Sequence, residues 1–382
     1  MKCAEAIAAF ARNAVRSLTL AAGRPGNTKH RRHQKKPNHS MEEDMLSLDK
    51  KSRLGLRPLA AALTALTALT LAAGFTAAHA ADDGLPKIPN KKPLKVGFAQ
   101  TESNNPWRLA ETKSFKDIAA KCGWQMVMTD ANSSAAKQVS DIQSMIAQHV
   151  DLLVFPPREE KPLVPVVMQA KKAGIPVILV DRNIDQSMAK AGKDYITFIG
   201  SDFIDQGQRA ADWLVKATNG KATIIELEGS TGASAANDRK KGFDDVIAKN
   251  PGMKIVASQS GDFARDKGRQ VMETLLQAHP DVTAVYAHND EMALGAIAAI
   301  KAAGKQPGKD IVLVTIDGTK GGLEAIKAGE LGASVQSSPF FGPLACDVAQ
   351  KYAKGETVPP WVKVSDRFYD KSNVDASMQY GY

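Results

Sequence analysis

The sequence predicts an α/β protein built from two doubly wound lobes, each with a parallel sheet. From residue 94 onward, short runs of apolar and β-branched residues alternate with longer amphipathic stretches, a pattern typical of strand–helix–strand units. The runs lack apolar–polar alternation, which indicates strands buried on both faces, as in parallel sheets covered by helices. The segment AKKAGIPVILVDR also resembles the later segment IKAAGKQPGKDIVLVTIDG. The pattern therefore occurs twice, which predicts two similar lobes.

The expected strands follow one another with room for a helix between most of them. For the first lobe we expect strands at residues 94–100, 124–130, 151–157, 175–181 and 195–202. For the second lobe we expect strands at residues 222–230, 254–262, 283–290, 311–318 and 332–338. In open α/β sheets a ligand binds beyond the carboxyl ends of the strands. Candidate binding residues are therefore expected directly after each run.

Composition and charge exclude several classes of protein. With 43% hydrophobic and 24% charged residues, the chain is neither fibrous nor wholly disordered. A length of 382 residues favours more than one packed unit. Residues 1–80 hold 13 of the 50 basic and 5 of the 41 acidic residues, so +8 of the net charge of +9 belongs to this leader. A nucleic-acid-binding surface is therefore not expected on the nearly neutral remainder.

The leader has the features of a secretory signal. Basic residues between positions 50 and 57 precede an uncharged Leu/Ala/Thr run at residues 59–73, and an Ala-His-Ala sequence follows at residues 78–80. Signal peptidases cleave after such a small-x-small pattern. We expect a signal over residues 45–80 that is cleaved before Ala81. The alternative is a retained membrane anchor, since the run approaches the length needed to span a bilayer.

Residues 1–44 lie upstream of this signal and include the basic stretch TKHRRHQKKPNHS. Charge runs of this kind are normally solvated. We expect that translation starts at Met41 or Met45 and that the upstream residues belong to an over-extended start. A nucleic-acid-binding tail is the alternative.

The sequence offers no catalytic or metal-binding motif. Outside the leader, which holds Cys3, Cys122 and Cys346 stand far apart and without a CxxC context, so a metal or redox site is not expected. They are either small buried residues or a disulfide, and their spacing does not decide between these. The small-residue run at 229–234 lacks the Gly-Lys-Ser/Thr ending of a phosphate loop. We expect neither enzyme activity nor a cofactor.

Planar hydrogen-bonding groups and aromatic rings follow the expected strands. They occur at residues 103–108, 181–183, 237–239, 261–263, 288–290 and 317–318. Asp, Asn and Arg can each bind neighbouring hydroxyls of a sugar, while an aromatic ring covers its apolar face. Taken singly, Asp181, Asn237 and Asn289 could be helix N-caps, and Trp107 and Phe263 could be core or lid residues. The whole set favours binding of a polyol.

These motifs resemble those of the type I periplasmic sugar-binding proteins of ABC transporters, over residues 94–382. The resemblance rests on SNNPW, VDRNID, GASAANDRKKGF, SQSGDFARDKGRQVM, YAHNDEMALGA and TIDG, which follow the family's order. It is greatest to the galactofuranose-binding branch. The ribose-binding branch usually has an Arg where Asn237 stands, which puts ribose itself in doubt. The resemblance implies two lobes joined by a three-segment hinge that close over one monosaccharide, galactofuranose or a related aldose.

The resemblance also implies a set of cavity residues. They are Trp107, Arg108, Asp181, Arg182, Asn237, Arg239, Phe263, Asn289 and Asp317, with Asp238 as a second-rank candidate. Crossovers are expected near residues 200–203, 336–339 and 364–369. The lobes would then comprise residues 81–201 with 339–364, and residues 202–338 with 365–382.

We further expect a monomeric periplasmic protein whose partners are the monosaccharide and the membrane permease of an ABC transporter, and not nucleic acid. Two alternatives belong to other classes. One is a sensory sugar-binding protein or the ligand-binding core of a repressor, although a secretory leader stands where repressors carry a helix-turn-helix. The other is a sugar-modifying enzyme, for which the sequence shows no base or nucleophile.

Overall fold

The computed structural model describes residues 84–382, so the expected signal and the upstream extension lie outside the described residues. The strands are β1 (Leu94–Gln100), β2 (Trp124–Asp130), β3 (Leu152–Phe155), β4 (Val177–Val180), β5 (Thr197–Ser201), β6 (Ala222–Glu228), β7 (Met253–Ser260), β8 (Ala284–Ala287), β9 (Val312–Asp317), β10 (Ala333–Gln336), β11 (Trp361–Val364) and β12 (Phe368–Asp370). The helices are α2 (Pro106–Cys122), α3 (Ala135–Ala147), α4 (Val164–Lys172), α5 (Phe203–Ala217), α6 (Ser234–Ile247), α7 (Arg265–Ala278), α8 (Asp290–Ala302), α9 (Lys320–Ala328), α10 (Gly342–Ala353), α11 (Val374–Ser377) and the 3-10 helix η1 (Met378–Tyr380).

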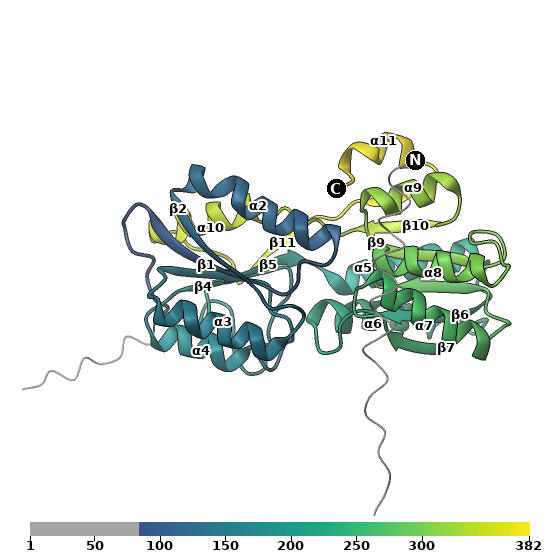
Figure 1. Cartoon of the computed structure of the whole chain (residues 1–382), viewed down its shortest axis with the longest axis horizontal. Helices are drawn as coiled ribbons and strands as arrows, with labels where there is room; N and C mark the ends of the chain where they lie inside the picture. The colour runs from purple at the N-terminus through teal and green to yellow at the C-terminus, as the bar shows by residue number, and fades with distance from the viewer. Residues whose placement is uncertain (1–83) are drawn as a thin grey trace, which may run out of the picture. The chain divides into compact units, whose positions relative to one another are not determined.

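The strands form two six-stranded sheets with corresponding strand orders (Figure 1). Their orders are β11-β5-β4-β3-β1-β2 and β12-β10-β9-β8-β6-β7. Neighbouring strands pair in parallel except β10 and β12, which are antiparallel. In each sheet the chain adds its second strand on one side of the first and its third strand on the other. Such a switch point opens a crevice at the carboxyl ends of the strands. The predicted fold class is confirmed.

Apolar side chains fill both faces of each sheet, which explains why the strands lack alternation in the sequence. In β3, Leu152 and Val154 belong to the cluster that contains Phe115 of α2, whereas Leu153 and Phe155 belong to the cluster on the opposite face. Figure 1 shows α2 and α10 on one face of this sheet and α3 and α4 on the other. Burial on both faces is the arrangement expected of parallel strands.

The chain passes between the two sheets three times. It leaves β5 of the first sheet for α5 of the second, and it leaves β10 of the second sheet for α10, which packs on α2. The third passage lies between β11, which pairs with β5, and β12, which pairs with β10. β11 and β12 were not among the expected strands, because they are short edge strands that lack a continuous buried apolar run; in β12 only Tyr369 is buried.

A disulfide joins Cys122 at the end of α2 to Cys346 in α10. The two Cα atoms lie 6.1 Å apart, within the usual span of a disulfide. This decides between the two alternatives that the sequence left open. The bond ties the helix that follows β1 to the helix that returns from the second sheet.

Two helices of the second lobe pack backbone against backbone. A Cβ added to Gly207 in α5 would lie 2.2 Å from the carbonyl oxygen of Arg239, and one added to Gly242 in α6 would lie 2.1 Å from that of Ile204. Only glycine permits so close an approach. The position of α6 against α5 is therefore set at these two residues.

Candidate functional site

A cavity lies where the carboxyl ends of the strands of both sheets meet. The space between its walls is about 310 Å³, a figure that includes open solvent. Its lining residues are Glu102, Asn105, Trp107, Arg108, Asp181, Arg182, Ala235, Arg239, Phe263, Asn289 and Asp317. All the predicted site residues except Asn237 are therefore brought together.

Three of these residues have unusual backbone conformations. Asp181, Phe263 and Asp317 have φ values of 57°, 58° and 137°, respectively. Positive φ is uncommon for residues other than glycine and costs free energy, and such residues cluster at functional sites. Asp181 directly follows β4, Asp317 is the last residue of β9, and Phe263 lies in the loop after β7. With these backbone conformations, all three residues line the cavity.

The first lobe contributes a dense network of buried charges. Arg108, in the first turn of α2, lies 2.7 Å from the Asp181 carboxylate, 2.8 Å from Glu111 and 3.2 Å from Glu102. Arg182 lies 3.4 Å from Glu102. Burial alone would raise the pKa of Glu102, but Arg182, Arg108 and Arg158 together lower it to about 2. Glu102 is thus ionised and holds the arginines in place.

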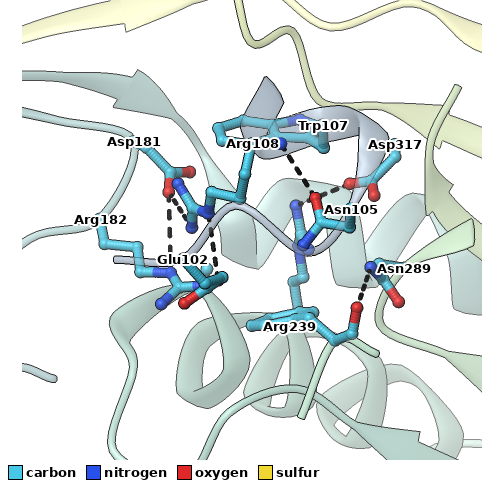
Figure 2. Close-up of a pocket in the computed structure, with 11 residues that line it drawn as sticks. Glu102, Asn105, Trp107, Arg108, Asp181, Arg182, Arg239, Asn289 and Asp317 are labelled. Atoms are coloured by element: carbon cyan, nitrogen blue, oxygen red, sulfur yellow. Dashed lines mark hydrogen bonds and ion pairs between the residues drawn. The ribbon is translucent and has the colours of Figure 1, made fainter. Parts of the chain in front are cut away.

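The second lobe contributes Arg239 and Asp317. Arg239 Nε donates to Gln206 Oε1 at 2.9 Å and its Nη1 donates to the His288 carbonyl at 2.7 Å. The nearest Arg239 nitrogen is 3.8 Å from the Asp317 carboxylate, too far for a hydrogen bond. Burial raises the pKa of Asp317 well above its usual value, although Arg239 opposes the shift. Figure 2 shows Asp181 and Asp317 on opposite sides of the cavity.

One buried donor at the cavity has no hydrogen-bond partner. Within residues 84–382, Arg182 Nε finds no acceptor, and its nearest carboxylate oxygen, on Asp181, is 3.6 Å away. A buried donor left unpaired costs about 1–3 kcal/mol. An oxygen of a bound ligand would remove this cost, so Arg182 is placed to donate to a ligand acceptor.

Two aromatic rings line the cavity and carry arginines on their faces. The Arg108 guanidinium lies 4.6 Å from the ring centroid of Trp107, and that of Arg182 lies 5.1 Å from the ring centroid of Phe263. Trp107 Nε1 also donates to the carbonyl of Ser337 at 2.8 Å, between the first lobe and the segment after β10. Both rings are nearly buried.

Two asparagines at the cavity also cap helices. Asn289 Oδ1 accepts from the backbone N–H of Met292 at the start of α8, and its Nδ2 donates to the carbonyl of Phe263. Asn105, which the expected set did not include, accepts from the backbone N–H of Arg108 at the start of α2. Capping and lining the cavity are thus not exclusive roles.

The structure differs from the expectation at Asn237. This residue is in the first turn of α6, and its Nδ2 donates to Glu160 of the first lobe at 2.6 Å, outside the cavity. Residues two apart on a helix do not share a face, so Arg239 points into the cavity and Asn237 does not. Asp238, the second-rank candidate, also lies outside the cavity, in a separate groove with Asp202 and Glu160.

The expected set of cavity residues did not include Glu102, Asn105 and Ala235, although Asn105 lies in the polar segment 103–108 noted after the first strand. Glu102 follows β1 by two residues, so its position after a strand was the available signal. Asn105 precedes the Pro at the start of α2, a position typical of an N-cap. Ala235 gave no signal, because a small residue at a helix start is compatible with many roles.

The chain matches the model of the periplasmic binding protein domain over residues 96–357. The chain belongs to the periplasmic binding protein family. It is 44% identical over 271 residues to the galactofuranose-binding protein YtfQ of Escherichia coli (strain K12), which covers 70% of this chain and 84% of that protein.

Two solved structures are also similar to this periplasmic binding protein. One is the binding component of an arabinose ABC transporter from Shewanella sp. ANA-3 with α- and β-L-arabinofuranose, with a TM-score of 0.71, 39% identity and coverage of 75% of this chain and 95% of that chain. The other is a protein from Mycobacterium smegmatis in complex with β-D-fucofuranose, with a TM-score of 0.71, 44% identity and the same coverage.

These similarities confirm the expected family, fold and solute-binding role. The matched family and one of the similar structures are named as periplasmic. The relatives are named for binding, which confirms that the chain is a binding protein rather than an enzyme. In the described part of the chain, no group of His, Cys, Asp and Glu side chains could hold a metal ion. No helix among residues 84–382 combines the length and the apolar character that a membrane span requires.

Proposed function

We propose that the protein captures one monosaccharide in its furanose form, galactofuranose or a related aldose, and delivers it to the permease of an ABC importer. The observation that carries this proposal is the cavity itself, because polar strand ends from both sheets and two aromatic rings converge on one small space. The furanoses bound by the two similar structures support the ring form.

Within this proposal, Asp181 and Asp317 accept hydrogen bonds from hydroxyls on opposite sides of the ring, and Arg108, Arg182 and Arg239 donate to its oxygens. Trp107 and Phe263 cover the apolar face of the sugar, and Asn289 holds the loop of Phe263. Asn237 leaves the set of contacts, because its amide binds Glu160. A sugar that contacts both lobes favours the closed arrangement, since a ligand shifts such an equilibrium only by its differential affinity.

The proposal includes how the chain is processed and divided. We infer a signal over residues 45–80 that is cleaved before Ala81, releasing a monomer into the periplasm. The first lobe takes residues 81–201 and 339–364, and the second takes residues 202–338 and 365–382. The membership of β11 in the first sheet and of β12 in the second supports these boundaries.

A thermal-shift screen of monosaccharides and cyclitols tests the ligand class. A ligand at about 1,000 times its Kd stabilises the folded state by about 4 kcal/mol, which a melting curve detects. We expect L-arabinose or D-galactose, which can form furanose rings, to raise the melting temperature, and methyl α-D-galactopyranoside, which cannot, to leave it unchanged. Stabilisation by the locked pyranoside or by a cyclitol alone would contradict the proposal.

Calorimetric titration of Asp317→Asn tests the site. Asparagine keeps the shape of the side chain but replaces one carboxyl oxygen, which can accept from a sugar hydroxyl, with an amide nitrogen that only donates. A buried polar group left without its partner costs about 1–3 kcal/mol, so we expect a Kd roughly five- to hundred-fold higher. Asp281→Asn, at an exposed position of the same lobe, is the matched control. Equal Kd values for the two variants would place the ligand elsewhere.

A further inference from the structure

The last residue of the chain lies against the cavity wall. The Tyr382 hydroxyl is 3.1 Å from the carbonyl oxygen of Asp317 and 3.0 Å from that of Ser337. The Ser337 oxygen also accepts from Trp107 Nε1. A carbonyl oxygen has two lone pairs, so the Ser337 oxygen can accept from Trp107 and from Tyr382 at the same time.

Contacts from both lobes hold Tyr382 at this place. Its backbone carbonyl accepts from the N–H of Lys320 in α9 of the second lobe. Its ring packs against the hydrophobic cluster of the first lobe that contains Trp107. The ring of Phe340 meets it edge to face, with the centroids 5.8 Å apart. Tyr382 therefore spans the segment by which the chain returns from β10 to α10.

We propose that Tyr382 is a positioning residue for the sugar site, acting through the carbonyls of Asp317 and Ser337. Asp317 has a φ of 137°, a conformation that persists only when its surroundings enforce it. The Tyr382 hydroxyl and the N–H of Ser337, which donates to the Asp317 carbonyl at 2.9 Å, both hold that backbone. The inference rests on the proposed function, because Asp317 and Trp107 are the residues that contact the sugar there.

The hydroxyl has one proton, which it shares between the two carbonyls, so Tyr382→Phe removes a single donor. Both carbonyls keep another partner, since Ser337 N–H still binds Asp317 and Trp107 still binds Ser337. The variant should therefore fold, while Asp317 and the Trp107 contact become less well fixed. A hydrogen bond of ordinary strength corresponds to a Kd roughly two- to twelve-fold higher.

The test compares Tyr382→Phe with Tyr380→Phe. Tyr380 is the matched control because its ring is 39% exposed and stacks on Arg367, away from the two carbonyls. Each variant is titrated calorimetrically with L-arabinose and with D-galactose and is melted without sugar. In parallel, the indole N–H signals of the four tryptophans are recorded by heteronuclear NMR, and that of Trp107 is assigned with Trp107→Phe.

We expect Tyr382→Phe alone to weaken sugar binding and to shift the Trp107 indole signal, with the other indole signals unchanged. A lower melting temperature with unchanged Kd and an unchanged Trp107 signal would show a purely structural role and overturn the inference. Identical behaviour of the two variants would overturn it as well. If the unaltered protein binds neither sugar, the proposed sugar class fails, and the Trp107 signal in Tyr382→Phe still decides the positioning role.

Discussion

Replacing Asp262 by Asn should weaken sugar binding although Asp262 does not line the cavity. Its carboxylate accepts from Arg158 at 2.7 Å, and this pair joins the loop after β7 in the second lobe to the loop after β3 in the first. A contact between lobes stabilises the closed arrangement and so contributes to the apparent affinity. Asp262 has a φ of 57°, which Asn tolerates as well as Asp does. The substitution therefore removes the charge with little change of backbone.

The magnitude follows from the burial of the pair. The Arg158 side chain is 7% exposed and that of Asp262 is 26% exposed, so solvent screens the pair in part. A fully buried hydrogen bond to a charge contributes about 1.5–3 kcal/mol, and an exposed ion pair about 0.2–1 kcal/mol. We take about 1 kcal/mol, which is roughly a five-fold increase in Kd. Calorimetric titration at low and high salt measures it, and salt should reduce the difference from the unaltered protein.

The control is Asp266→Asn, which makes the same change of charge at an exposed position in the first turn of α7. Its Kd should equal that of the unaltered protein. If Asp262→Asn also binds with unaltered Kd, the pair adds nothing to closure, and the reasoning that assigns it to the closed arrangement is refuted.

Two further predictions concern stability. The double variant Cys122→Ser, Cys346→Ser should lose about 2–4 kcal/mol of unfolding free energy without a change in Kd, and an unaltered urea midpoint would contradict this. Burial raises the pKa of Glu111 from 4.5 to about 7, although Arg108 opposes the shift. The unfolded chain thus releases this proton at lower pH than the folded one, so the group's contribution to stability falls as pH rises from 4.5 to about 7. Glu111→Gln should remove this fall, which urea midpoints measured between pH 4.5 and about 7 would show. The same pH dependence of the midpoint in the variant and in the unaltered protein would contradict the prediction.

The fold could be predicted because it depends on a pattern repeated along the chain. Runs such as those that form β3 and β4 are buried on both faces, and no other arrangement of short apolar runs explains them as simply. The edge strands β11 and β12 could not be predicted in this way. Apart from the buried Tyr369, their residues are at least partly exposed, and their pairing depends on where the chain crosses between the sheets.

Cavity residues could be predicted where strand topology determines their position. They were harder to predict where the face of a helix or contacts with distant charged residues determine it. Asp181 directly follows β4 and Asp317 ends β9, and both strands pair in parallel with their neighbours, so the two residues lie at the carboxyl ends of their strands. Asn237 shares a short stretch with Arg239 but lies on another side of α6. Glu102 forms ion pairs with Arg108, Arg158 and Arg182, which belong to separate parts of the fold. No local sequence pattern predicts that these residues come together.

The close packing of α5 on α6 has a consequence for how ligand preference can change. Gly207 is not a cavity residue, yet it touches the backbone from which Arg239 extends. A single methyl group at position 207 would displace that carbonyl and, with it, the arginine that we propose as a donor to the sugar. Selectivity can thus drift through substitutions at buried glycines while every cavity side chain stays the same. We therefore expect Gly207→Ala to change the sugar preference although every side chain that lines the cavity is retained.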